Sequence, residues 1–199
     1  MNLDEKISGK CMEIIKNNVE KSEEEFEKIQ YGIKIIIINL FKFIILFLTA
    51  YFLGVLNYCI VAVVSFGILR TFASGVHAES SIKCIFMNYV IFLGNVFLSL
   101  RFSLNIVSVI VIYTIGLILI ILYSPADTAE RPLVSKRLRK SLKIKSIVAV
   151  ELLIIISIML PHSVYRNIII YSVLEEAVLI TPIAYALLRK SYKNYKDLK

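Results

Sequence analysis

The sequence has few cysteines, and they form no pattern that builds a metal site or a disulfide framework. Three are present among 199 residues: Cys11, Cys59 and Cys84. An odd number, with no CxxC pair and no cluster of cysteine with histidine, argues against disulfide staples and against zinc. We therefore predict a protein that works without a metal ion or a cofactor.

Acidic residues are scarce relative to basic ones: 15 Asp and Glu stand against 23 Lys and Arg, a formal net charge of +8. A basic chain can bind nucleic acid, but no recognisable nucleic-acid-binding motif accompanies the charge. In membrane proteins an excess of Lys and Arg marks the cytoplasmic loops instead. We expect no nucleic-acid partner.

Apolar residues are abundant, at 58% of the chain with a mean hydropathy of +0.76. A soluble domain of this length cannot bury so much apolar surface, because average proteins are only about half apolar. The apolar residues also come in long blocks. The sequence therefore predicts a single all-α domain over residues 1–199, embedded in a lipid bilayer.

Six segments approach the roughly 20 apolar residues that a membrane helix needs. They run from about Ile35 to Leu56, Tyr58 to Leu69, Ile85 to Leu100, Leu104 to Tyr123, Ser146 to Leu160 and Val164 to Leu188. Ahead of them, residues 1–30 carry apolar side chains near helical spacing between charges. This pattern predicts an amphipathic helix, either in the membrane interface or packed on the protein's own cytoplasmic face. No cleavable signal peptide is visible, so the first span is expected to direct insertion.

The basic residues predict the orientation of these spans. With a cytoplasmic N-terminus, six spans also place the C-terminus in the cytoplasm, and 20 of the 23 Lys and Arg then lie inside. Arg101 and Arg166 lie outside, and Lys42 lies within a span. The distribution follows the positive-inside rule and predicts a multi-pass protein of the cell membrane with both termini cytoplasmic.

Residues 70–84, between the second and third spans, combine a nucleophile, a base, a glycine and hydroxyl groups. They read Arg-Thr-Phe-Ala-Ser-Gly-Val-His-Ala-Glu-Ser-Ser-Ile-Lys-Cys. A thiol is mostly protonated at neutral pH and needs a base or a lowered pKa to be an efficient nucleophile. Histidine titrates near neutrality and supplies such a base, which makes Cys84 and His77 the candidate catalytic pair. A lone cysteine in a membrane protein is usually a packing residue, as we interpret Cys59.

The spacing of seven residues between His77 and Cys84 does not suit one straight helix. Seven residues advance about 10.5 Å along a helix, whereas a hydrogen bond needs about 3 Å. We therefore predict that the chain bends between these two residues, with Gly75 permitting unusual backbone angles beside His77. Ser80 or Ser81 would cap a helix that leads into the third span, and Cys84 would lie in its first turn, where the helix dipole favours a thiolate.

Residues 70–84 resemble the signature of the accessory gene regulator B family, multi-pass membrane cysteine endopeptidases of Gram-positive bacteria. The stretch Ser124–Pro132 resembles that family's cytoplasmic loop containing proline and aspartate, and the length, span layout and motif positions agree over nearly the whole chain. One departure is Ser74, where the family often carries the first of two glycines. It bears on the flexibility of the loop and leaves the nucleophile and base in place.

The resemblance implies that the chain processes a pro-peptide of the accessory gene regulator D type, the precursor of a cyclic quorum-sensing pheromone. His77 would be the general base and Cys84 the nucleophile of an acyl-enzyme thioester, which an internal cysteine of the peptide resolves into a thiolactone ring. The resemblance also suggests a homodimer. Residues expected to support the chemistry or position the substrate are Arg70, Gly75, Ser81, Glu79 and Asp127. The last two are the candidates to orient the histidine.

Charges outside the motif have competing interpretations. The basic stretch after the fourth span determines topology and contacts anionic lipid, or it also captures an acidic pro-peptide tail. The residues predicted for capture are Arg131, Lys136, Arg137, Arg139 and Lys140. Ionisable groups at membrane depth are costly and usually functional, and we expect Lys42 to meet Glu175 or Glu176 as a structural pair between helices.

Two other functions remain open. A small transporter or channel is supported by charges within the spans but not by any visible internal repeat. A thiol acyltransferase would use the same cysteine–histidine pair on a lipid or another non-peptide donor. A short reading frame beside the gene, encoding an amphipathic start, a central cysteine and an acidic end, would favour the peptidase.

Overall fold

The computed structural model of the chain describes residues 22–76, 81–129, 132–160 and 163–196, together with Gly9 and Ile15. Within these residues every regular element is a helix, and Ser74 and Ala126 form an isolated β-bridge. The all-α prediction is therefore confirmed for this part of the chain. The chain divides into two compact units, residues 1–52 and residues 53–199; that they work as one peptidase domain stays a prediction.

The first unit is dominated by one long helix, α2 (Glu23–Phe52). A capping box begins it: the Ser22 hydroxyl accepts the Glu25 N–H at 3.3 Å, and the Glu25 carboxylate accepts the Ser22 N–H at 3.2 Å. The helix ends at a turn in which Gly54 has a φ of 70°. Residues 23–30 were expected to belong to a separate interfacial helix, but they run without a break into the first expected span. Most of the remainder of that amphipathic segment lies outside the described residues.

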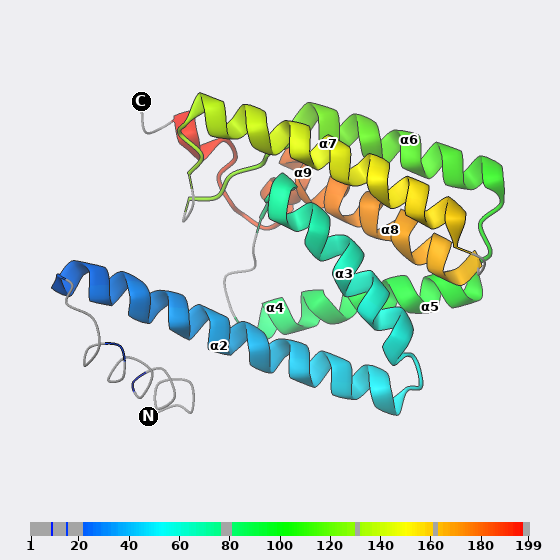
Figure 1. Cartoon of the computed structure of the whole chain (residues 1–199), viewed down its shortest axis with the longest axis horizontal. Helices are drawn as coiled ribbons and strands as arrows, with labels where there is room; N and C mark the ends of the chain where they lie inside the picture. Colours follow the sequence, from blue (N-terminus) through cyan, green and yellow to red (C-terminus); the bar gives the residue numbers. More distant parts are fainter. Residues whose placement is uncertain are drawn as a thin grey trace. The chain divides into compact units, whose positions relative to one another are not determined.

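The second unit is a bundle of helices (Figure 1). Its elements are α3 (Leu56–Ala73), α4 (Ser81–Asn88), the π-helical turn η1 (Tyr89–Leu93), α5 (Gly94–Arg101), α6 (Ile106–Tyr123), α7 (Lys136–Met159), α8 (Ser163–Leu179), α9 (Pro182–Leu187) and the 3-10 turn η2 (Asn194–Lys196). Helix α8 packs against α3, α5, α6 and α7. The C-terminal ends of α3, α6 and α8 and the N-terminal end of α7 lie at the same end of the bundle.

Three helical stretches among the described residues are long and apolar enough to cross a bilayer, fewer than the six predicted. They are Leu56–Ala73, Cys84–Arg101 and Ile106–Tyr123, and a shorter apolar stretch, Ile36–Phe52, ends α2. The other two predicted spans are helical but more polar. Helix α7 carries Lys143, Lys145 and Glu151 beside its apolar residues, and the 17-residue α8 contains Arg166, Glu175 and Glu176.

Several predicted boundaries are wrong, each for a local reason. Helix α3 is longer than the short second span that we expected, because it continues through Arg70 to Ala73. The fifth predicted span corresponds to α7, which begins at Lys136, ten residues before the predicted start at Ser146. The Ser135 hydroxyl caps this helix by accepting the Leu138 N–H at 3.3 Å. The sixth predicted span is broken into α8 and α9. Pro182 cannot continue a helix, since it lacks an N–H.

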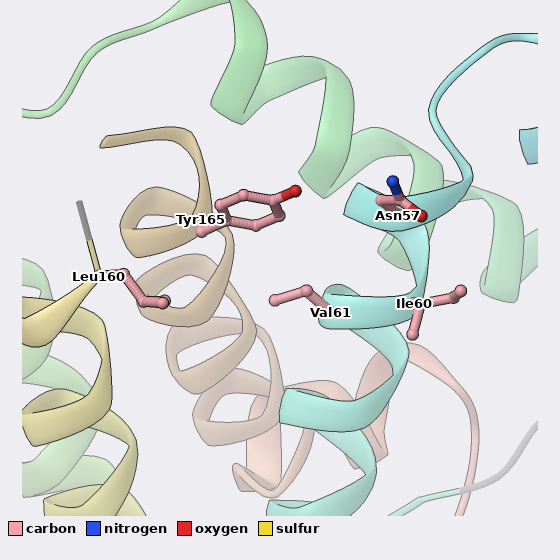
Figure 2. A pocket seen from close by; sticks show the side chains of 5 residues that line it. All are labelled: Asn57, Ile60, Val61, Leu160 and Tyr165. Atoms are coloured by element: carbon pink, nitrogen blue, oxygen red, sulfur yellow. The ribbon is translucent and has the colours of Figure 1, made fainter. Parts of the chain in front are cut away.

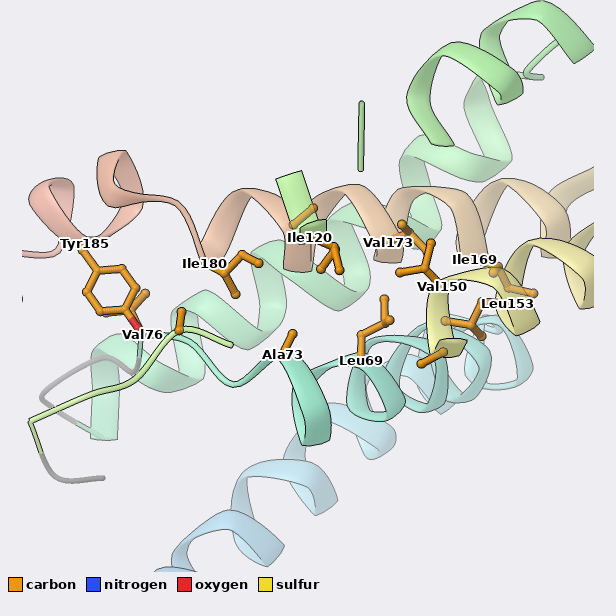
Figure 3. Close-up of a cluster of buried hydrophobic side chains, with 13 residues drawn as sticks. Leu69, Ala73, Val76, Ile120, Val150, Leu153, Ile169, Val173, Ile180 and Tyr185 are labelled. Atoms are coloured by element: carbon orange, nitrogen blue, oxygen red, sulfur yellow. The ribbon is translucent and has the colours of Figure 1, made fainter. Parts of the chain in front are cut away.

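The core of the second unit reaches the end of the bundle that carries the candidate site (Figure 3). Its centre is formed by helix residues such as Leu69, Ile120 and Val173, all nearly inaccessible to solvent. Val76 and Ala126, which lie in connecting loops, belong to the same buried cluster. The loop that follows α3 and the loop that follows α6 are therefore both packed as part of the core.

The described surface of this unit includes a cavity and a groove. A cavity of about 270 Å³ is lined by Asn57, Ile60, Val61, Leu160 and Tyr165 (Figure 2), near the residues at which α3 and α8 begin. A groove of about 370 Å³ lies between α3 and α7, with Lys145 among otherwise apolar lining residues. Cys84 lines neither the cavity nor the groove, whereas Phe72, within residues 70–84, lines the groove.

Candidate functional site

The backbone bends sharply where α3 ends, within the candidate motif of residues 70–84. Ser74 has a φ of 61° and Gly75 a φ of 124°, both in the region that L-residues rarely adopt. A non-glycine residue held in such a conformation costs about 1–3 kcal/mol and persists only where surrounding contacts fix it. The chain therefore enters His77 from a loop whose shape is imposed by its surroundings.

Arg70, in the last turn of α3, supplies the strongest of these contacts. Its Nη1 donates to the Ser74 carbonyl at 3.0 Å and lies 3.3 Å from the Glu176 carboxylate of α8, while its Nη2 donates to the Val76 carbonyl. Glu176 is fully buried and the Arg70 side chain is only 18% exposed. A buried charge needs a partner, and here the guanidinium satisfies one carboxylate and two loop carbonyls. We call this arrangement the Arg70 clamp.

A glycine is required at position 75 because its φ is positive and because no room is left for a Cβ atom. A Cβ at this position would lie 2.5 Å from the Arg70 Nη1 and 3.1 Å from the Cγ2 of Ile180. The guanidinium that would be displaced is the one that holds the loop. Any side chain at Gly75 therefore competes with the Arg70 clamp.

A second support comes from the loop that follows α6. The Ala126 N–H donates to the Ala73 carbonyl at 2.9 Å, which forms the bridge beside Ser74. The next residue, Asp127, is 3% exposed, and its carboxylate accepts the N–H groups of Asn194 at 3.1 Å and Tyr195 at 2.7 Å. The C-terminal turn η2 thus holds this loop in place against the end of α3.

Tyr185 of α9 completes that support. Its hydroxyl donates to the Asp127 carbonyl at 2.7 Å. The ring of Tyr192 contacts the Tyr185 ring edge-on. Burial raises the pKa of Tyr192 above its ordinary value, so this phenol stays protonated at neutral pH.

The structure places only part of the predicted catalytic pair. Cys84 lies in α4 as a free, partly buried thiol, three residues after Ser81, with which that helix begins. His77 and Glu79 lie outside the described residues, so the approach of the imidazole to the thiol stays a prediction. Among the residues that are described, no group of three His, Cys, Asp or Glu side chains is placed to hold a metal ion.

The predicted tail-binding residues fall into two groups. Lys136, Arg137 and Lys140 are exposed on the first turns of α7. Arg139 is partly buried, with its guanidinium 3.6 Å from the centre of the Tyr195 ring, and is therefore engaged with the C-terminal turn. Arg131 lies outside the described residues.

Glu176 is the residue whose partner the sequence did not reveal. We expected Lys42 to pair with it or with Glu175, whereas the structure pairs Glu176 with Arg70. Glu175 instead accepts a hydrogen bond from Asn95 of α5 at 3.1 Å. One feature of the sequence could have indicated this pair: Arg70 ends one apolar segment, and Glu176 lies near the end of another that runs in the same direction.

The chain was compared with known proteins. The family described as Accessory gene regulator B matches residues 8–181. A protein of Clostridium acetobutylicum described as AgrB-like is 35% identical over 175 residues, which cover 88% of this chain and 84% of that protein. Accessory gene regulator protein B of Staphylococcus intermedius is 31% identical over 183 residues, which cover 86% of this chain and 96% of that protein. No solved structure matches the chain.

Proposed function

Because the chain belongs to the accessory gene regulator B family, and so has a role in quorum-sensing peptide maturation, we propose that it is a membrane cysteine endopeptidase. Its substrate is a pro-peptide of the accessory gene regulator D type. The observation that carries the proposal is that the family match spans the whole motif of residues 70–84. The bend at Ser74 and Gly75 and the Arg70 clamp support it, since they fix the backbone that leads to His77. The bend that the spacing demands between His77 and Cys84 stays a prediction.

In the first step His77 takes the thiol proton of Cys84, and the thiolate attacks the carbonyl carbon of the scissile peptide bond. The carbon–nitrogen bond then breaks, the imidazolium gives its proton to the departing amine, and the C-terminal tail leaves. The core peptide stays bound to Cys84 as a thioester. This step splits one difficult acyl transfer into two easier ones.

In the second step an internal cysteine of the peptide attacks that thioester. A new carbon–sulfur bond forms, the bond to Cys84 breaks, and the enzyme thiol is restored as the thiolactone ring closes. One thioester replaces another, so the exchange is nearly isoenergetic, and water must be kept away from the intermediate. A site at the inner membrane interface excludes water better than an open groove does.

The proposed enzyme crosses the membrane six times with both termini in the cytoplasm. The grouping of basic segments in the bundle supports this: the C-terminal end of α3, whose last turn contains Arg70, lies at the same end as the start of α7 and the segment after α9. Polar residues of α8 find partners within the bundle, as Glu176 does with Arg70, which is how an ionisable group is tolerated at membrane depth. The exposed residues Lys136, Arg137 and Lys140 would capture the acidic tail of the substrate from the cytoplasm.

The direct test is co-expression of the chain with a candidate pro-peptide, followed by mass measurement of the released tail. Wild type should release the tail and form the thiolactone, whereas Cys84→Ala and His77→Ala should release none. Cys59→Ala is the matched control, because this second thiol is buried in α3 away from the motif and its removal should leave processing intact. Equal tail release by all four proteins would refute the proposed function.

A further inference from the structure

We infer that Glu176 is a positioning residue of the reaction proposed above, on which this inference rests. It holds the Arg70 guanidinium at the point where that group binds the carbonyls of Ser74 and Val76, the latter being the last residue before His77. Glu176 acts through Arg70 and the backbone, not on the substrate. It thereby sets the position of the backbone that leads to His77, the proposed general base.

The burial of the pair explains why the arginine needs this carboxylate. Glu176 is fully buried in α8, and the Arg70 side chain is 18% exposed. Removing one partner of such a pair leaves the other charge buried without compensation. Arg70 would then turn toward solvent or lipid headgroups, and in doing so it would release both carbonyls.

The geometry of the guanidinium makes the arrangement specific. Its planar fork donates in fixed directions, and Arg70 uses one nitrogen for Ser74 and Glu176 and the other for Val76. The loop it holds has backbone angles that cost energy, with φ of 61° at Ser74 and 124° at Gly75. Without the clamp the loop would relax, and a shift of about 1 Å in a catalytic group can cost about 100-fold in rate.

The adjacent carboxylate offers a matched control within the same helix turn. Glu175 accepts a hydrogen bond from Asn95 of α5, and that amide also donates to Ser172. Glu175→Gln keeps an oxygen for this hydrogen bond and replaces a buried carboxyl group by an amide of the same shape, as Glu176→Gln does one residue later. The two variants therefore differ in whether the replaced carboxyl group faces Arg70.

A second control separates positioning from stability. The double variant Arg70→Met, Glu176→Met replaces the buried ion pair by apolar side chains of similar length, a change that is often neutral or stabilising. If the pair served only stability, processing should return together with the fold. If it positions the loop, the double variant should melt at the wild-type temperature and still process poorly.

The experiment measures the steady-state rate of tail release over a range of pro-peptide concentrations and, separately, site-resolved alkylation of Cys84 by iodoacetamide across pH. For Glu176→Gln we expect kcat to fall about 10- to 100-fold with KM within about threefold, in line with a misplaced catalytic group. We also expect its Cys84 alkylation profile to move toward that of His77→Ala. Glu175→Gln should retain the wild-type kcat and profile, and the double methionine variant should resemble Glu176→Gln.

Two outcomes would overturn the inference: Glu176→Gln with the kcat and alkylation profile of wild type, or recovery of processing in the stable double methionine variant. Failure of the proposed function has a different signature, because wild type itself would then release no tail. The alkylation profiles need no pro-peptide and still decide whether Glu176 governs the reactivity of Cys84.

Discussion

Near each end of α8 an arginine donates a hydrogen bond to a loop carbonyl, but the two loops differ in their backbone angles. At the end near the motif, Arg70 binds two carbonyls and a buried carboxylate. At the opposite end, Arg166 donates to the Leu104 carbonyl and Asn167 to the Phe102 carbonyl, each at 3.0 Å. Both sets of contacts fasten a connection between helices to the same central helix.

The backbone shows why only one of these ends points to chemistry. The loop between α5 and α6 has ordinary extended angles, φ of −116° at Phe102 and −75° at Asn105, and the Asn105 side chain caps α6. The loop after α3 has two consecutive residues at positive φ. Strained backbone that the surroundings must fix is concentrated at functional sites. The end held by Arg70 therefore carries a constraint that fastening helices alone does not require.

The largest difference between the ends should come from deleting the arginines. Arg70→Ala leaves Glu176 buried without a counter-charge, which costs about 3–5 kcal/mol, and should abolish tail release. Arg166→Ala removes a charged donor from one carbonyl, costs about 1.5–3 kcal/mol, and should keep kcat within a few-fold of wild type in the folded fraction. Denaturation in detergent and single-turnover tail release measure the two effects. Equal kcat losses would show that the ends are equivalent.

A smaller contrast separates two glycines on either side of Arg70. Gly75→Ala introduces a Cβ at a φ of 124° and 2.5 Å from the guanidinium, and should cost about 1–3 kcal/mol with a tenfold or greater loss of kcat. Gly67→Ala lies within α3 with nothing near its Cβ, and should be neutral or stabilise by up to about 1 kcal/mol. Melting temperature and tail release test both. A tolerated Gly75→Ala would contradict the tight fit of the clamp.

The loop after α6 should have a weaker effect, because it acts on the backbone beside Ser74. Asp127→Ala removes the acceptor of two N–H groups, at about 1–3 kcal/mol for buried groups left unpaired, and should loosen the C-terminal turn in hydrogen exchange. Asp127→Asn keeps an acceptor and should retain most of the kcat. If Asp127 orients His77 directly, Asp127→Asn should instead lower kcat strongly and shift its pH profile.

The smallest effect is expected on the exposed basic residues of α7. Reversing the charges of Lys136, Arg137 and Lys140 should raise the KM for a pro-peptide with an acidic tail about 3- to 10-fold, less at high salt because exposed charges are screened. The kcat should be unchanged once the topology of the variant is verified. Arg139 is excluded from the set because it contacts Tyr195. An unchanged KM would remove the capture role.

Much of the fold followed from the sequence, because apolar blocks and their breaks are local properties. The fourth span was expected from Leu104 to Tyr123, and α6 runs from Ile106 to Tyr123. The sequence analysis missed the break between α8 and α9, because the apolar pattern continues across it and a single residue, Pro182, ends the helical hydrogen bonding. The basic stretch before Ser146 was not expected to be helical, because charge alone does not reveal a capped helix that packs on a bundle.

The candidate site was less predictable, because its contacts join distant parts of the chain. A nucleophile and a base seven residues apart can be recognised in the sequence, and so can a glycine close to the base. The partner of Arg70 is 106 residues away, and nothing local to Glu176 distinguishes it from Glu175. Which of two adjacent carboxylates faces the arginine depends on the rotation of α8, and packing alone fixes that rotation.

The central claim is that Cys84 forms a thioester with the pro-peptide core when His77 takes its proton. The most direct measurement is the intact mass of the protein after incubation with a pro-peptide whose internal cysteine is replaced by alanine, so that the ring cannot close. We predict an adduct of the core's mass on Cys84, labile to neutral hydroxylamine and absent in His77→Ala. Tail release without any adduct, or an adduct that persists in Cys84→Ala, would contradict the mechanism.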